Sequence, residues 1–276
     1  MAVFPPKPNA LKEIFGREKV LIGTVHSQPL PGSPRYRGEP LEEVYAFAVE
    51  EARRYQEGGF HGLIVENSWD LPFSKPEDLG LETAATMAVL AERVAEVGLP
   101  VGVNVLANGV ACSLAVAKAA GGRFIRANQW VNAYIANEGF IEGPAPAVSR
   151  YRAWLHADDV HVFADVHVKH GSHAIVADRP LDELTRDAEF FDADVLIATG
   201  HRTGGAADPA ELAGIRDATT LPVILGSGVT IDNASELLAV CDGAIVASSL
   251  KEDGVWWKPV EVERVRALAA LADELW

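Results

Sequence analysis

The chain has 276 residues, of which 49% are hydrophobic and 23% are charged, a composition typical of globular proteins that excludes a disordered chain. The formal net charge is −15 and no cluster of lysines or arginines stands out, so the sequence predicts no nucleic-acid partner. No apolar run approaches the ~20 residues of a membrane span, and the first residues lack the pattern of a secretory signal, so we expect a cytoplasmic protein.

Short aliphatic runs alternate with amphipathic stretches along the chain. The aliphatic runs predict eight strands at 20–25, 62–65, 101–105, 123–126, 161–166, 195–198, 222–225 and 243–247. Nearly continuous apolar strands are typical of a parallel sheet that is buried on both faces. The stretches between them predict helices at 41–56, 83–97, 111–120, 144–155, 181–191, 209–217, 233–240 and 260–275. Eight strand–helix units predict a (β/α)8 barrel.

The beginning of the chain predicts one more short helix, at 11–15, which we expect to close the bottom of the barrel. No linker or low-complexity segment divides the chain, so residues 1–276 are predicted to form a single domain. A doubly wound open sheet is the alternative fold. It would be favoured by a glycine-rich turn after the first strand, but Val25, His26 and Ser27 stand there instead.

Three of the predicted strand-to-helix loops are long: 27–37, 67–78 and 128–143. Each follows the carboxyl end of a strand, where barrels of this kind place their active sites. Long ordered loops in compact domains are usually lids or binding loops. We therefore expect these three loops to cover the mouth of the barrel.

The strongest functional pattern lies after the last two predicted strands. One strand ends in Gly226, Ser227 and Gly228, and the next is followed by Ser248 and Ser249. Glycine lets backbone N–H groups approach an anion closely, and a helix N-terminus adds a positive dipole. Phosphate-binding (β/α)8 barrels hold the phosphate at these two loops. The pair therefore predicts a phosphate site.

A second pattern follows the fifth predicted strand, where Asp165, His167 and Lys169 alternate with apolar residues. Side chains alternate along a strand, so these three are expected to share one face and to point into the mouth. Asp165 or His167 would then act as a general base. Lys169 would stabilise an oxyanion or form a Schiff base. Asp165, His167 or His170, and Glu66 are candidate ligands for a divalent metal, and no other cofactor is predicted.

Polar residues stand at the ends of most other predicted strands, a pattern typical of a site for a small, hydroxyl-rich ligand. With Glu66 as a further catalytic candidate, the predicted binding residues are His26, Asn67, Asn104, Arg126, Asn128, His170, Thr199 and Gly200. The loop after Gly200, with glycines at 204 and 205, is expected to be another polar part of the site.

Several of these segments resemble the BtpA/SgcQ family. The segments are 23–34, with its His-x-x-Pro-Leu-Pro-Gly run, 65–67, 102–106, 124–126, 164–170 and 226–228, and the resemblance extends from about residue 20 to residue 251. It implies a phosphate-binding (β/α)8 barrel. The family takes its name from a protein needed for photosystem I accumulation, and other members carry enzyme names.

The first functional hypothesis is an enzyme that acts on a phosphorylated sugar or nucleotide-like compound by isomerisation, lyase chemistry or glycosidic cleavage. A Schiff-base aldolase that uses Lys169 and a metal-dependent hydrolase are the enzymatic alternatives. The non-enzymatic alternative is an assembly or stability factor of the kind for which the family is named. A homo-oligomer is also expected, since the aromatic and valine-rich outer helices offer surfaces for association.

Overall fold

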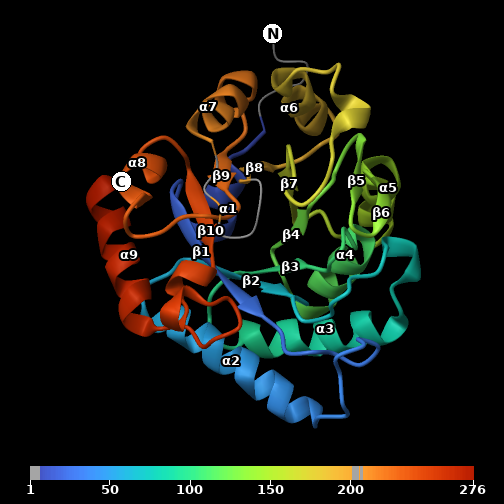
Figure 1. Cartoon of the computed structure of the whole chain (residues 1–276), viewed down its shortest axis with the longest axis vertical. Helices are drawn as coiled ribbons and strands as arrows, with labels where there is room; N and C mark the ends of the chain where they lie inside the picture. The colour runs from blue at the N-terminus through green and yellow to red at the C-terminus, as the bar shows by residue number, and fades with distance from the viewer. Residues whose placement is uncertain (1–6, 201–204, 206–207) are drawn as a thin grey trace.

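Within the part of the chain that the structure describes, residues 7–200, 205 and 208–276, the eight predicted strands form one closed parallel barrel (Figure 1). This computed structural model confirms the predicted (β/α)8 fold and excludes the open sheet. Neighbouring strands follow the order β1-β10-β9-β8-β7-β4-β3-β2. Their bounds are β1 Val20–His26, β2 Gly62–Glu66, β3 Val101–Asn104, β4 Phe124–Ala127, β7 His161–Asp165, β8 Val195–Ala198, β9 Val223–Leu225 and β10 Gly243–Val246.

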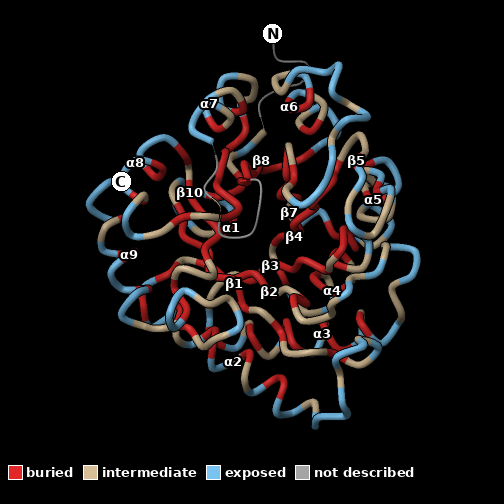
Figure 2. The backbone as a smooth tube through the Cα atoms, in the orientation of Figure 1, coloured by how far each residue is buried: buried red, intermediate tan, exposed pale blue. Residues whose placement is uncertain are grey.

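Helices surround the barrel, with their buried residues turned towards the strands (Figure 2). In α2, Val44, Ala48 and Tyr55 are buried at helical spacing, which gives the helix one apolar face. The bounds are α2 Leu41–Glu57, α3 Leu81–Ala95, α4 Val110–Ala120, α5 Ala145–Trp154, α6 Leu181–Phe190, α7 Pro209–Ala218, α8 Ala234–Leu238 and α9 Val262–Leu275. Helix α8 is shorter than the predicted segment 233–240.

The short N-terminal helix α1 (Ala10–Phe15) closes the bottom of the barrel, as the sequence predicts. Its buried Leu11 and Ile14 belong to the same apolar cluster as the inward-facing side chains of the strands. Phe124 and Phe163 stack within that cluster, with ring centroids 4.4 Å apart. These side chains fill the lower part of the barrel interior, so a site within the barrel can open only at the opposite, carboxyl end of the strands.

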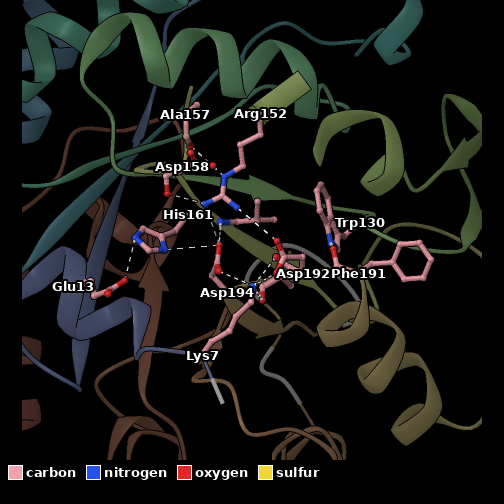
Figure 3. A network of polar contacts seen from close by, with 12 residues as sticks. Lys7, Glu13, Trp130, Arg152, Ala157, Asp158, His161, Phe191, Asp192 and Asp194 are labelled. Carbon is pink, nitrogen blue, oxygen red and sulfur yellow. Dashed lines mark hydrogen bonds and ion pairs between the residues drawn. The ribbon is translucent and has the colours of Figure 1, made fainter. Parts of the chain in front are cut away.

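A polar network fixes the strands near the N-terminal end of β7 and β8 (Figure 3). The buried carboxylate of Asp194 accepts hydrogen bonds from the backbone N–H of Val162 at 2.8 Å and from Lys7 at 2.9 Å. Arg152 donates to the carbonyl oxygens of Ala157 and Asp158. These contacts join segments that are far apart in the sequence, and their place in the barrel indicates a role in stability.

The loops at the carboxyl ends of the strands contain structure that the sequence pattern did not indicate. The loop after β4 holds an antiparallel hairpin, β5 (Ala133–Ala136) and β6 (Gly139–Glu142). Four 3-10 turns occur among the described residues: η1 Pro76–Asp78, η2 Ala174–Val176, η3 Ser248–Leu250 and η4 Glu252–Gly254. The loop expected after Gly200 lies outside the described residues, apart from Gly205.

No helix in the described part of the chain combines the length and the apolar character needed to cross a bilayer.

Candidate functional site

A cavity of about 930 Å³ opens at the carboxyl ends of the strands. The predicted site residues that line it are His26, Glu66, Asn104, Arg126, Asn128, Lys169, His170, Gly226, Ser227, Gly228, Ser248 and Ser249. Those that do not line it are Asn67, Asp165, His167, Thr199 and Gly200. The long loops after β2 and β4 contribute to the lining, whereas the loop at 27–37 contributes no lining residue.

The loop after β9 begins with a glycine that no other residue can replace without movement. A Cβ on Gly226 would lie 2.5 Å from Cγ2 of Ile197 and 3.0 Å from a guanidinium nitrogen of Arg126. The N–H of Gly226 donates to the carbonyl of Ala198 at 2.8 Å, which continues the ladder with β8. Gly228 has φ of 78°, a left-handed conformation that glycine adopts readily. The local sequence thus shapes a tight turn at the rim of the cavity.

The loop after β10 lies against this turn. The hydroxyl of Ser249 donates to the carbonyl of Val229 at 2.7 Å and so joins the two loops. The backbone N–H groups of Ser227, Gly228 and Ser248 have no hydrogen-bond acceptor among the residues that the structure describes. Several unengaged N–H groups in adjoining loops are the arrangement that binds phosphate in other proteins. We refer to the segments 226–230 and 247–250, where the sequence predicts a phosphate site, as the phosphate loops.

Helix α9 adds a cation beside the phosphate loops. Arg264 lines the cavity, and its Nη1 donates to the carbonyl of Ser249 at 3.4 Å. Its Nε contacts the carboxylate of Glu261. The sequence pattern did not indicate this residue, because an arginine in a charged helix is ordinary. The sequence signal that could have indicated Arg264 is its position in the first turn of the helix after the last predicted strand.

The centre of the site contains a buried ion pair between β4 and β7. Arg126 donates from Nε and Nη2 to the two carboxylate oxygens of Asp165, both at 2.9 Å. The side chain of Arg126 is 5% exposed and that of Asp165 is 0% exposed. A two-point pair of this kind fixes the guanidinium in one orientation. Both oxygens of Asp165 are therefore engaged, and the carboxylate lies beneath the cavity rather than in it.

Glu66 at the end of β2 is one of four carboxylates that line the cavity, with Glu138, Asp232 and Asp253. Its Oε2 accepts a hydrogen bond from Asn104 at 3.4 Å. Burial raises the pKa of Glu66, and the positive charges of Arg126 and Lys169 oppose that rise. A carboxylate with a raised pKa takes up a proton more readily near neutral pH than an exposed one. The geometry thus gives Glu66 the features of a general base.

The alternation predicted for 165–169 is wrong, because β7 ends at Asp165 and the chain turns after it. Lys169 nevertheless reaches the cavity from this turn. Burial lowers the pKa of Lys169 to about 8, and the nearby charge of Arg126 adds to the effect, while Glu66 and Asp165 oppose it. A lysine with this pKa is partly neutral near physiological pH and so can act as a nucleophile.

His167 is directed away from the cavity. Its Nδ1 lies 3.7 Å from Oε1 of Glu211 on α7, and its ring centroid is 4.0 Å from that of His173. The predicted set Asp165, His167 and Glu66 is therefore not assembled. Within residues 7–200, 205 and 208–276, no three His, Cys, Asp or Glu side chains gather as metal ligands do.

His26 at the end of β1 is held as a neutral imidazole. Its Nδ1 lies 3.1 Å from the carbonyl oxygen of Trp256, which can only accept, so Nδ1 carries the proton. Burial lowers the pKa of His26 to about 3, and the charge of Lys251 adds to this shift. Its Nε2 is consequently a hydrogen-bond acceptor at neutral pH.

Two amide oxygens in the lining are buried without a partner. Oδ1 of Asn104 and Oδ1 of Asn128 form no hydrogen bond to any described residue. Buried polar atoms are nearly always paired in folded proteins, so an unpaired acceptor in a cavity favours a ligand that donates to it. Hydroxyl groups of a small molecule meet that need.

Three of the remaining predicted residues lie behind the lining, and the fourth, His170, lies at its rim. Oδ1 of Asn67 accepts from the backbone N–H of Leu106 at 2.7 Å, which joins the loops after β2 and β3. Thr199 donates its hydroxyl to the carbonyl of His167 at 3.1 Å. Gly200 is buried at the end of β8, and His170 is exposed at the rim, with φ of 69°.

The sequence of the chain matches one known protein family over nearly its whole length. The model of the BtpA family matches residues 17–274, nearly the whole chain. The chain belongs to the BtpA family. The predicted resemblance is thereby confirmed.

Relatives of this BtpA-family chain occur in distant organisms. It is 39% identical to an uncharacterised protein of Pyrococcus furiosus over 96% of this chain and 99% of that one. It is 36% identical to the photosystem I biogenesis protein BtpA of Synechocystis, over 96% of this chain and 92% of that one. An uncharacterised mitochondrial protein of Caenorhabditis elegans is 33% identical over 89% and 90% of the two chains.

Solved structures similar to this BtpA-family barrel include several enzymes. Thiamine phosphate pyrophosphorylase from Pyrococcus furiosus superposes with a TM-score of 0.55 at 18% identity, over 94% of this chain and 96% of that one. N-(5'-phosphoribosyl)anthranilate isomerase from the same organism gives 0.55 at 12% identity, over 93% and 99%. Tryptophan synthase from Mycobacterium tuberculosis gives 0.58 at 16% identity, over 98% and 99%. At these identities the similarity shows the shared barrel fold.

Proposed function

We propose that this BtpA-family chain is an enzyme that binds a phosphorylated sugar or nucleotide-like compound and catalyses isomerisation, lyase chemistry or glycosidic cleavage. One observation carries the proposal. A single cavity combines unengaged N–H groups at the phosphate loops with a carboxyl of raised pKa and an amine of lowered pKa, Glu66 and Lys169. Perturbed titratable groups in a cleft are typical of active sites.

The proposed division of roles follows from the contacts. The phosphate binds to the N–H groups of Ser227, Gly228 and Ser248, and Arg264 adds positive charge beside them. Binding energy from this remote group holds the reacting carbon at the centre of the cavity. The orphan amide oxygens of Asn104 and Asn128 accept hydrogen bonds from sugar hydroxyls.

We assign the proton transfer to Glu66 rather than to Asp165, whose oxygens both pair with Arg126. A carboxylate oxygen of Glu66 takes a proton from the substrate, and the electron pair remains on the substrate as a developing negative charge. The ammonium form of Lys169 stabilises that charge. Asp165 acts as a positioning residue that fixes Arg126.

A charge substitution in the phosphate loops tests the proposal. Ser248 is half-exposed, lines the cavity and donates no side-chain hydrogen bond among the described residues, so Ser248→Asp places a carboxylate beside the phosphate without removing a contact. We expect it to weaken binding of ribose 5-phosphate at least about tenfold, or ~1.4 kcal/mol, by calorimetric titration. Ser235→Asp, on the exposed face of α8 outside the cavity, is the matched control. Equal affinity in both variants, or no binding to the unmodified protein, contradicts the proposal.

A Schiff-base lyase is a second candidate, and the lowered pKa of Lys169 favours it. The neutral amine of Lys169 would attack a substrate carbonyl carbon, and loss of water would form a C=N bond. Borohydride then reduces that bond to a stable secondary amine. A mass increase on the peptide that contains Lys169, absent in Lys169→Met, supports this candidate. No adduct with carbonyl-bearing sugar phosphates refutes it.

The other two alternatives have less support. The absence of an assembled ligand set among the described residues disfavours the metal-dependent hydrolase built on Asp165, His167 and Glu66. The name of the Synechocystis relative supports an assembly factor for photosystem I. A relative occurs in a nematode, an animal without photosystems, which argues against that role for the whole family. If a variant with both Glu66→Gln and Lys169→Met restores the biological role in cells that lack the protein, the result would favour the non-enzymatic role.

The proposal extends to the state of the protein in the cell. We propose that the whole chain folds as one domain, that it forms a homo-oligomer, and that it acts in the cytoplasm. Light scattering coupled to size-exclusion chromatography tests the oligomer, limited proteolysis tests the single domain, and cell fractionation tests the location.

A further inference from the structure

The cavity has an apolar side that a sugar phosphate would leave uncovered. Leu71, Phe73, Leu106, Tyr134 and Val168 line it together, and we refer to these five residues as the apolar wall. They come from the loops after β2, β3, β4 and β7. An apolar surface gains stability when a ligand removes it from water, so this side indicates an apolar part of the substrate.

Two members of the apolar wall, Leu106 and Tyr134, lie across the mouth from the phosphate loops. The other three follow β2 and β7, which are two strands away from β10 and β9 respectively. In the closed strand order, β10 is four strands away from β4, and β9 is four strands away from β3, so each pair is diametrically opposed (Figure 1). The phosphate loops follow β9 and β10, whereas Leu106 and Tyr134 follow β3 and β4. A ligand held at both places must span the cavity with its phosphate at one end.

Hydrogen bonds between loops hold the apolar wall in place. The N–H of Ala107 donates to the carbonyl of Ser74 at 3.2 Å, which joins the loops after β3 and β2. The side chain of Asn108 bonds the backbone N–H of Gln129 at 2.9 Å and its carbonyl at 3.0 Å, which joins the loops after β3 and β4. A surface that is already ordered loses little entropy when a ligand binds.

The ring of Tyr134 is fixed in the same way. It stacks on the imidazole of His173, with centroids 5.2 Å apart and an interplanar angle of 12°. His173 in turn donates from Nε2 to the carbonyl of Val168 at 2.8 Å. In the hairpin, the backbone N–H of Ile135 donates to the carbonyl of Ser172 at 3.0 Å, and the carbonyl of Ile135 accepts from the N–H of Ser172 at 2.8 Å. Tyr134 is only 5% exposed, so it forms a rigid base for the apolar wall, and the partly exposed ring of Phe73 offers the stacking surface for a planar ring.

Polar groups also occur at this end of the cavity. Ser68, Asn137 and Glu138 belong to the same lining as the apolar wall. A purely hydrocarbon ring would leave them without partners, whereas the edge of a nucleobase carries hydrogen-bond donors and acceptors. The volume of about 930 Å³ is at the upper end of the roughly 300–1,000 Å³ typical of ligand sites and exceeds the needs of a bare sugar phosphate.

We propose that the substrate is a nucleoside monophosphate, with its base on the apolar wall, its ribose hydroxyls at Asn104 and Asn128, and its phosphate at the phosphate loops. This inference rests on the proposed function and narrows its substrate class. Stacking on aromatic side chains tolerates any base, so the geometry assigns the class of compound and not one base.

Calorimetric titration compares the four ribonucleoside 5'-monophosphates with ribose 5-phosphate. We expect at least one nucleotide to bind about tenfold more tightly than ribose 5-phosphate, or ~1.4 kcal/mol. Phe73→Ala should abolish that advantage and leave the affinity for ribose 5-phosphate unchanged. Phe140→Ala is the matched control, because Phe140 is 41% exposed on β6 and does not line the cavity.

The outcomes separate this inference from the proposed function. If ribose 5-phosphate binds as tightly as every nucleotide, and Ser248→Asp weakens it, the phosphate site stands and the nucleotide inference is overturned. The inference is also overturned if Phe73→Ala weakens ribose 5-phosphate and nucleotides equally, or changes neither. If no phosphorylated probe binds, both proposals fall together.

Discussion

Replacement of Asp165 by asparagine tests whether the buried ion pair between Asp165 and Arg126 stabilises the protein. The change keeps the size of the side chain but removes its charge, and it brings an amide nitrogen against a nitrogen of Arg126 that now donates at 2.9 Å. The side chain of Arg126 is 5% exposed, so its charge would lose its partner in a buried setting. Breaking a buried pair in this way costs about 3–5 kcal/mol, which corresponds to a fall in Tm of roughly 6–20 °C.

Scanning calorimetry and urea unfolding measure this effect, and Asp182→Asn provides the control. Asp182 pairs with Arg186 on the surface of α6, where the two side chains are 44% and 50% exposed. Solvent screens such a pair, so its loss should cost less than about 1 kcal/mol. A loss below about 1 kcal/mol for Asp165→Asn, or equal losses for the two variants, would refute the view that Asp165 serves mainly to hold Arg126.

Three further predictions follow from the site. Burial raises the pKa of Glu66, so the folded protein holds the carboxyl proton more tightly than the unfolded chain, and stability is lost as pH rises through the folded pKa. Glu66→Gln should therefore raise Tm more at about pH 8 than at about pH 4, and an equal gain at both pH values would refute the raised pKa. Lys169 should react with an acylating reagent with a midpoint near its pKa of about 8, measured by mass spectrometry with exposed Lys12 followed in the same digest. A midpoint near about 10.4 would contradict this. Gly226→Ala should lower stability by about 1–3 kcal/mol through overpacking, whereas Gly214→Ala on α7, where a Cβ meets only ordinary contacts, should be neutral or stabilising by calorimetry.

The barrel could be predicted because its signals are local. Each strand is a short apolar run, each helix has an apolar face, and the helix ends carry proline or glycine, as at Pro40 and Gly121. The glycine-rich turn after β9 is also a local signal, since Gly226 and Gly228 stand where only glycine fits without strain.

The parts that could not be predicted depend on contacts between distant segments. Asp165 resembles a free catalytic carboxylate in the sequence, and only the position of Arg126 on the neighbouring strand reveals the pair. The direction of His167 depends on Glu211, and the apolar wall depends on four loops that hydrogen bonds join together. Periodicity carries no information about such pairings, because it describes one segment at a time.

The most direct measurement is a crystal structure of the protein grown with ribose 5-phosphate or a ribonucleoside 5'-monophosphate. The account predicts a phosphate between the two phosphate loops, with its oxygens within hydrogen-bond distance of the N–H groups of Ser227, Gly228 or Ser248. A phosphate bound elsewhere would contradict it, above all in the second cavity at the opposite end of the barrel, which Lys7 and Arg216 line.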